Sequence, residues 1–220
     1  MKNLSHLFVT ILIGITPFFA AAEDSLPVRT DTAIQILQKI AISDKPIPQV
    51  VLDEAVGVAI VKIVRGGFIV GGQHGNGIIL KHLGGGKWSA PLAFDMGGGS
   101  FGAQIGGDVV DYVFVLNNDV ALEMFTSSNE VKFDAGAAAT AGPDNATANK
   151  KDLPGKSIYV YSTTDGAFAG ATVGGSYIKV EPEVNQATYG MEVTTEQILS
   201  GKVKGLPSSK KLVALLNGKS

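Results

Sequence analysis

The chain has 220 residues, of which 45% are hydrophobic and 17% charged, enough to form one domain with a substantial core. Its 18 Lys and Arg residues stand against 20 Asp and Glu residues, and the two signs are interspersed. This balance excludes a surface-wide basic field, so we expect no nucleic-acid partner. The 28 glycines follow no three-residue period, which excludes a collagen-like chain and predicts many tight turns or bulges.

Residues 1–22 have the pattern of a secretory signal peptide. Lys2 precedes an apolar run from Leu4 to Phe19, and Ala20, Ala21 and Ala22 follow that run. We expect cleavage after Ala22, export to the periplasm or the medium, and a single domain over residues 23–220. An uncleaved membrane anchor is the alternative, but the apolar run is short for a membrane span.

Cysteine is absent from the sequence. Disulfides, thiolate metal sites, cysteine nucleophiles and a lipid-modified cysteine are therefore excluded. Any attachment of the chain to a membrane has to be noncovalent.

The beginning of the exported part predicts two helices. Asp31 or Thr32 is a candidate N-cap for an amphipathic helix that ends before Pro46. Residues 47–55 predict a second, short helix. The apolar face of the first helix carries Ile34, Leu37, Ile40 and Ala41.

From residue 56 onward the composition becomes typical of strands, because β-branched and aromatic residues alternate with glycine pairs. We expect a turn at Gly66 and Gly67, a loop over residues 81–87 and a hairpin turn at residues 164–166. The expected strands cover residues 56–64, 68–72, 77–80, 92–96, 101–105, 108–117, 158–163 and 168–180.

The second half of the chain also predicts helices between its strands. Asn118 is a candidate N-cap for a helix that ends near Ser127, and residues 135–153 predict a long loop. Residues 195–201 and 208–218 predict two short C-terminal helices.

These elements together predict the fold class. The strands follow one another through short glycine turns and not through long helices, which disfavours parallel winding. We expect an α+β, mainly β domain in which an antiparallel sheet closes or stacks into a sandwich or barrel-like core. N-terminal and C-terminal helices flank this sheet, and the apolar run over residues 109–116 forms a central strand.

Enzyme motifs occur but lack the context that their chemistry needs. Gly98-Gly99-Ser100-Phe101-Gly102 fits G-x-S-x-G, yet a strand pattern follows the serine where a helix is required. Two histidines, His74 and His82, have no acidic residue at a metal-binding spacing. We expect no enzyme activity, no cofactor and no metal.

Several ordered motifs resemble the SYLF domain family. The resemblance covers residues 31–201. The motifs are the run from Val56 to Gly77, residues 86–91, residues 99–106, Tyr161-Ser162, residues 166–170, Gly175-Ser176 and Tyr189-Gly190. Members of that family are described as phosphoinositide-binding in animals and associated with actin in fungi, so the resemblance implies membrane-lipid binding without catalysis. The leader and the missing adaptor domain depart from the eukaryotic pattern, which argues against actin and favours a bacterial envelope protein.

We therefore expect an anionic phospholipid of phosphoinositide type, or another amphiphile, to be bound at the envelope. The first helix is one candidate surface, either lying in a headgroup layer or packing on the sheet. Basic side chains at the strand ends form a second candidate surface. They either converge on a phosphate or lie scattered in solvent. A structural or protein-binding module without a lipid ligand is the alternative function. The candidate lipid-binding residues are Lys39, Lys45, Lys62, Arg65, Lys81, Lys87 and Trp88.

Trp88 is the only tryptophan, and the sequence leaves two positions open for it. Its ring suits a membrane interface or a plug over the core.

Overall fold

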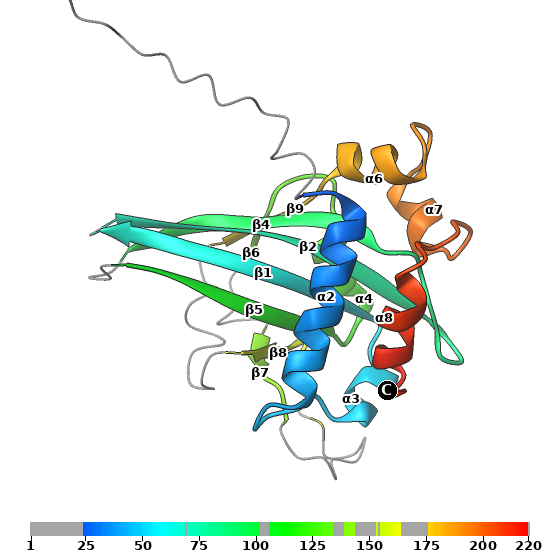
Figure 1. Ribbon diagram of the computed structural model, residues 1–220, viewed down its shortest axis with the longest axis horizontal. Coiled ribbons are helices and arrows are strands. Elements are labelled where there is room, and N and C mark those ends of the chain that lie inside the picture. The colour runs from blue at the N-terminus through cyan, green and yellow to red at the C-terminus, as the bar shows by residue number, and fades with distance from the viewer. Residues whose placement is uncertain are drawn as a thin grey trace, which may run out of the picture.

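A curled sheet with helices on both faces makes up the part of the chain that the computed structural model describes (Figure 1). The described residues are 24–68, 70–101, 106–133, 139–143, 153, 155–163 and 176–219. The strands are β1 (Gly57–Phe68), β2 (Val70–Gly84), β3 (Lys87–Trp88), β4 (Leu92–Phe101), β5 (Gly106–Leu116), β6 (Val131–Phe133), β7 (Ala139–Ala141), β8 (Ile158–Ser162) and β9 (Ser176–Val180). The helices are α2 (Leu26–Ala41), α3 (Gln49–Asp53), α4 (Asp119–Thr126), α6 (Pro182–Tyr189), α7 (Thr195–Leu199) and α8 (Ser209–Leu216).

The strand order is β6-β9-β4-β2-β1-β5-β8-β7, with β3 paired to β2 beside this path. The α+β, mainly β fold with flanking helices is confirmed. The sheet is mixed, however, and not purely antiparallel, because β7 pairs with β8 in parallel while the other described pairs are antiparallel. β7 lies within the segment that was expected to be a loop, where three small residues give little strand signal.

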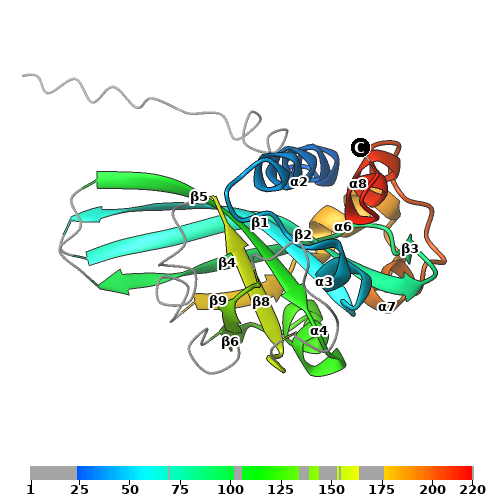
Figure 2. The same cartoon turned by 90° about the horizontal axis from the view of Figure 1, so that it is seen from below.

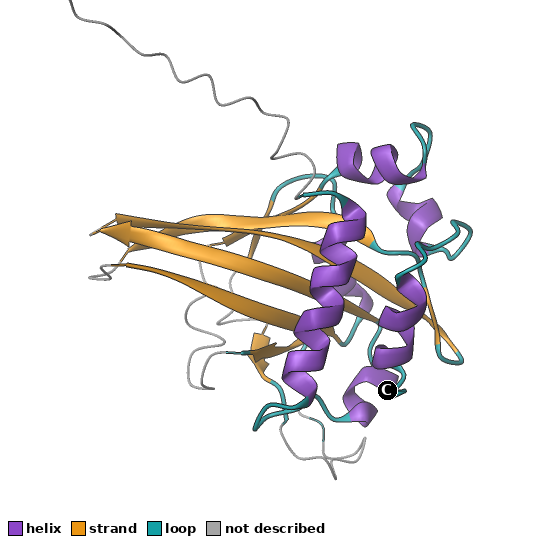
Figure 3. Cartoon of the chain, in the orientation of Figure 1, coloured by secondary structure: helices purple, strands orange, loops and turns teal. Residues whose placement is uncertain are grey.

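The curled sheet separates two apolar cores, which Figure 2 shows from below. On the concave side, α4 places Phe125 against Phe94, Phe114 and Phe133, with ring centroids 5.3 to 5.9 Å apart. On the other side, α2, α3 and α8 cover the sheet. Strands β1, β2, β4 and β5 extend past this helical layer at one end of the sheet (Figure 3).

Helix α2 begins earlier than the sequence predicts. Ser25 occupies the N-cap position and Pro27 lies in the first turn, whereas Asp31 and Thr32 lie inside the helix. The predicted N-cap was wrong because a proline in the first turn suits a helix start and outweighs the capping signal five residues later. The apolar face is buried against the sheet, with Ile34, Leu37 and Ile40 at most 6% exposed.

The glycine pairs in the first hairpin are strand residues and not turns. Gly66 and Gly67 pair with Gly72 and Gly71, so β1 and β2 continue through them. Residues 70–72 and the predicted strand at 77–80 therefore belong to one strand, β2, whereas Phe68 ends β1. The predicted turn was wrong because pairing on both sides of β1 outweighs the local turn preference of glycine.

The loop expected at residues 81–87 is largely strand. β2 continues to Gly84, and a tight turn leads into β3. The turn needs glycine because Gly84, Gly85 and Gly86 all have positive φ.

The predicted short helices are confirmed as α3, α4, α7 and α8, and the Asn118 side chain caps α4 by accepting a hydrogen bond from the Ala121 amide. Helix α6, with Pro182 in its first turn, was not predicted. The expected strand residues Ala103 and Ile105, the turn at 164–166 and residues 168–175 lie outside the described residues.

Candidate functional site

Four polar side chains form a row across the centre of the sheet on the face that α2 covers. Strand register places Asp95 of β4 opposite Asn76 of β2, Asn76 opposite Lys62 of β1, and Lys62 opposite Asp111 of β5. We call these four residues the polar row. It lies where the buried apolar residues of the α2 side end, because the preceding register row is Ile60, Ile78, Ala93 and Val113.

Beyond the polar row, the same face becomes exposed and progressively loses its side chains. The next row holds His74, Val64 and Val109, and the two valines are 57% and 55% exposed. The row after that consists only of Gly99, Gly72, Gly66 and Gly107 on four adjacent strands, which we call the glycine row.

Packing does not explain two glycines of the glycine row, Gly72 and Gly99. A Cβ at Gly99 would have no atom within 4 Å, and one at Gly72 would meet only the Gly98 carbonyl oxygen at 4.0 Å. Neither glycine has a positive φ. Glycine inside a strand weakens it and often marks a position that another molecule approaches closely.

Arg29 fixes α2 to one end of the polar row. Its guanidinium is buried and forms ion pairs with Asp24, at 2.7 Å, and with Glu181. It also donates to the carbonyl oxygen of Phe94 at 3.1 Å. Asn76 donates its side-chain amide to Asp24, so the start of α2 is tied to both β2 and β4.

Lys39 fixes α2 to the opposite end of the row. Its ammonium lies 2.9 Å from Oδ2 of Asp111, and the ammonium of Lys62 lies 3.9 Å from Oδ1 of the same carboxylate. The Asp111 side chain is only 8% exposed, whereas both lysine side chains are substantially exposed. Two cations therefore share one buried anion, which leaves one excess positive charge at the solvent side.

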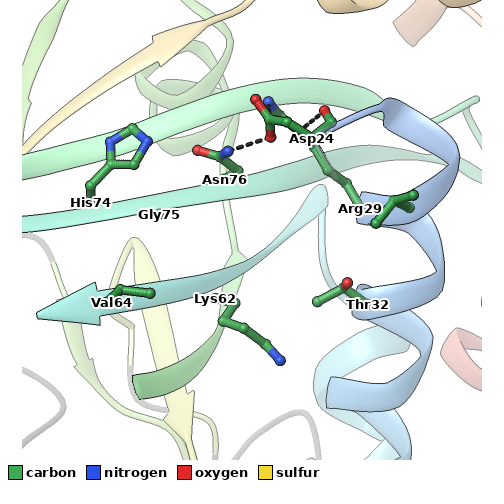
Figure 4. A pocket seen from close by; sticks show the side chains of 9 residues that line it. Asp24, Arg29, Thr32, Lys62, Val64, His74, Gly75 and Asn76 are labelled. Atoms are coloured by element: carbon green, nitrogen blue, oxygen red, sulfur yellow. Dashed lines mark hydrogen bonds and ion pairs between the residues drawn. The ribbon is translucent and has the colours of Figure 1, made fainter. Parts of the chain in front are cut away.

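A cavity of about 200 Å³ opens between α2 and strands β1 and β2 (Figure 4). Its walls combine charged and apolar groups. The lining residues are Asp24, Val28, Arg29, Thr32, Lys62, Val64, His74, Gly75 and Asn76. This volume is small for a drug-sized ligand and suits a small polar group instead.

Asp95 is the strongly perturbed carboxyl group beside this cavity. Burial, together with the negative charges of Glu181 and Asp24, raises its pKa to about 6, although His74 and Arg29 act in the opposite direction. The His74 Nε2 atom lies 3.6 Å from Asp95 Oδ1. The carboxyl group is thus charged at neutral pH and neutral in mild acid.

The structure brings together only two of the seven predicted lipid-binding residues, Lys39 and Lys62, which meet at Asp111. Arg65 is three residues beyond Lys62 on the same strand, so it faces the other side of the sheet. Lys45 is exposed in the turn after α2. Lys81 lies five residues from Asn76 along β2, about 17 Å in an extended strand, and Lys87 lies on β3.

The sequence left open whether Trp88 lies at a membrane interface or plugs the core, and the structure places it in the core. Its side chain is only 9% exposed and stacks on His82, with ring centroids 4.5 Å apart. Its indole nitrogen donates to Asn217 at 3.1 Å, which joins β3 to the end of α8.

Asp24, Asn76 and Glu181 belong to the site, but sequence reasoning did not single them out. They come from three distant segments, and only the strand register and the position of α2 bring them together. A polar residue inside each of four apolar strands was the signal that could have identified the row.

Within the described residues, no helix combines the length and apolar character needed to cross a membrane. In the same part of the chain, no group of three or more His, Cys, Asp or Glu side chains is arranged to hold a metal ion.

Comparison with known proteins identifies the family. The family model described as "Ysc84: Las17-binding protein actin regulator" matches residues 97–219, more than half of the chain. The chain therefore belongs to the Ysc84 family, and the resemblance to the SYLF domain family is confirmed.

Curated relatives share the domain at about one third identity. Protein YSC84 of Saccharomyces cerevisiae is 34% identical over 182 residues, which are 81% of this chain and 39% of the relative. LAS seventeen-binding protein 3 of the same yeast is 34% identical, with 81% of this chain and 40% of the relative covered. SH3 domain-containing YSC84-like protein 1 of Mus musculus is 32% identical over 176 residues, which are 79% of this chain and 52% of the relative.

The match thus spans between about two fifths and one half of the length of these relatives. No solved structure matches the chain.

Proposed function

We propose that this protein is a non-catalytic module of the cell envelope that binds membrane lipid headgroups in the cavity between α2 and the sheet. The observation that carries the proposal is the position of Lys62. Lys62 lines the open cavity, its ammonium shares the buried Asp111 with Lys39, and the exposed Val64 lies two residues further along β1. A cationic group beside exposed apolar residues suits an amphiphile with a phosphate headgroup.

The arrangement of the apolar residues supports binding beside the exposed end of the sheet and not through the apolar face of α2. The buried face of α2 is occupied by the sheet, whereas Val28, Val64 and Val109 are exposed near the cavity. The leader-like residues 1–22 support the envelope as the place of action.

Co-sedimentation with vesicles tests this proposal. The chain beginning at Glu23 is mixed with phosphatidylcholine vesicles and with vesicles that also contain phosphatidylglycerol, over a salt series. We expect binding to the anionic vesicles that weakens as salt shortens the Debye length. We also expect Lys62→Gln to reduce binding severalfold, because each cation at an anionic surface contributes about 1 kcal/mol.

Lys45→Gln is the matched control because it removes the same charge from an exposed position outside the cavity. If Lys45→Gln reduced binding as strongly as Lys62→Gln, the protein would bind through general surface charge and not through the cavity. Absence of binding to both of these vesicle types and to vesicles that contain phosphatidylethanolamine would refute lipid binding by this protein.

A protein partner is the second candidate function. It is favoured by the matched family description, which names Las17 binding and actin regulation, and by the yeast relative named as a LAS seventeen-binding protein. The expectation from the leader argues against cytoplasmic actin for this chain. Affinity capture from envelope extract with wild type and Lys62→Gln tests it, since one defined protein retained without lipid would support this alternative.

A further inference from the structure

We propose that the cavity takes a primary ammonium group, so that its ligand is a phosphate ester carrying an ammonium on a two-carbon linker, as ethanolamine phosphate does. This inference rests on the proposed function and names the chemistry of its ligand. It differs from the purely anionic headgroup expected from the sequence.

The first observation is a set of acceptor atoms without a donor at hydrogen-bond distance, since the Lys62 ammonium lies 3.9 Å from Asp111 Oδ1 and His74 Nε2 lies 3.6 Å from Asp95 Oδ1. Oδ1 of Asn76, Oδ1 of Asp95 and Oδ1 of Asp111 are buried without a hydrogen-bond partner. All three belong to the polar row, and Asn76 lines the cavity. Buried acceptors without donors are costly, so a group that brings several N–H donors to this row would be strongly favoured.

The second observation is the charge at one end of the row. Asp24, Asp95 and Glu181 surround the single guanidinium of Arg29, and His74 contacts Asp95 from the exposed side. Lys179 is the register partner of Asp95 on β9, but its side chain is exposed. The three carboxylates outnumber the two cations, Arg29 and Lys179, so this end of the row carries a net negative charge. That charge attracts an ammonium group and repels a phosphate.

The opposite end of the row has the opposite sign. Lys39 and Lys62 share only Asp111, so this end carries one excess positive charge. Lys62 and Asp95 are two strands apart in the same row, which places their Cα atoms about 10 Å apart. A phosphate near Lys62 and an ammonium near Asn76 and Asp95 fit between them, and the small cavity suits a headgroup of this size.

Two soluble probes test the inference directly. O-phosphoethanolamine and ethyl phosphate share the phosphate, but only the first carries an ammonium. Amide chemical-shift titrations at pH 7.5 measure the affinity of the chain beginning at Glu23 for each probe. We expect O-phosphoethanolamine to bind about tenfold more tightly, the effect of one charge-assisted hydrogen-bond site.

Three variants locate the effect. Asp95→Asn keeps the size of the side chain but removes its charge, and it should reduce the tenfold preference for O-phosphoethanolamine over ethyl phosphate to parity. Lys62→Gln should weaken both probes. Glu123→Gln is the matched control, because this exposed carboxylate lies on α4, which packs on the other side of the sheet.

Each outcome separates this inference from the function on which it rests. Equal affinity for the two probes, or an unchanged preference in Asp95→Asn, would overturn the ammonium site without affecting lipid binding. Vesicle binding by wild type without binding of either probe would also overturn it, whereas failure of vesicles and probes together would overturn both proposals.

A vesicle arm distinguishes a lipid headgroup from a free metabolite. Phosphatidylethanolamine in phosphatidylcholine vesicles should compete with O-phosphoethanolamine for wild type if the ligand is a lipid. Binding of the soluble probe without such competition would retain the ammonium site and reject the lipid as its source.

Discussion

At the scale of single residues, Asp95 makes stability depend on pH. Burial and neighbouring negative charges raise its pKa to about 6, above the ordinary value of 3.8. The folded state therefore holds this proton more tightly than the unfolded state does, and stability falls as pH rises from about 4 to about 6. Above that window the penalty is constant, on the order of 1 kcal/mol after allowance for solvent screening.

Asp95→Asn should remove this penalty. We expect the variant to be more stable than wild type at pH 8 by on the order of 1 kcal/mol and to show no such gain at pH 4, where Asp95 is protonated. Urea unfolding at the two pH values measures the difference. A gain of equal size at both pH values would show that the charge of Asp95 is not the cause.

Arg29 is the residue whose loss should damage the fold most. Arg29→Met keeps the apolar stem but leaves Asp24 and Glu181 without their cation, and we expect a loss of about 3–5 kcal/mol in unfolding free energy. Lys45→Met, at an exposed position, should change stability by less than about 0.5 kcal/mol. Chemical denaturation of both variants makes the comparison, and equal effects would contradict the anchoring role of Arg29.

At the scale of elements, the glycines of β2 and β4 fall into two physically different groups. Gly77 is required by packing, because a Cβ there would overlap the carbonyl oxygen of Ile60 and the ring of Phe94. Gly99, in the glycine row, has open space around it. Glycine is thus required by core packing at Gly77, whereas at Gly99 it leaves the surface of the sheet without a side chain.

Substitution should separate the two groups. Gly99→Thr should stabilise the fold by a few tenths to about 1 kcal/mol, since threonine favours strands and meets no obstacle. Gly77→Ala should destabilise it by about 2–3 kcal/mol through overpacking. Thermal unfolding measures both, and destabilisation by Gly99→Thr would mean that this position is constrained in the fold itself.

The elements also show what sequence patterns can predict. The apolar run of β5 and the cap at Asn118 were predictable because burial and capping act over a few neighbouring residues. The strands through Gly66 and Gly72 were not, because only pairing with two neighbouring strands keeps glycine extended there.

At the scale of the whole molecule, the site was less predictable than the fold. Lys62 and Lys39 were identified as bases, but their common partner Asp111 lies 49 and 72 positions further along the chain. The predicted helix began after Arg29, whereas α2 begins at Leu26 and buries Arg29 between Asp24 and Glu181. Such contacts depend on strand register, which local periodicity does not determine.

The polar row has a consequence for how the sheet assembles. Glycine-rich strands specify their alignment weakly, because few side chains distinguish one alignment from the next. A slip of β1 by one residue would turn Lys62 toward the phenylalanine core and leave Asp111 without that cation. Pairing of Lys62 with Asp111 therefore favours the native register over others that the glycines alone would tolerate.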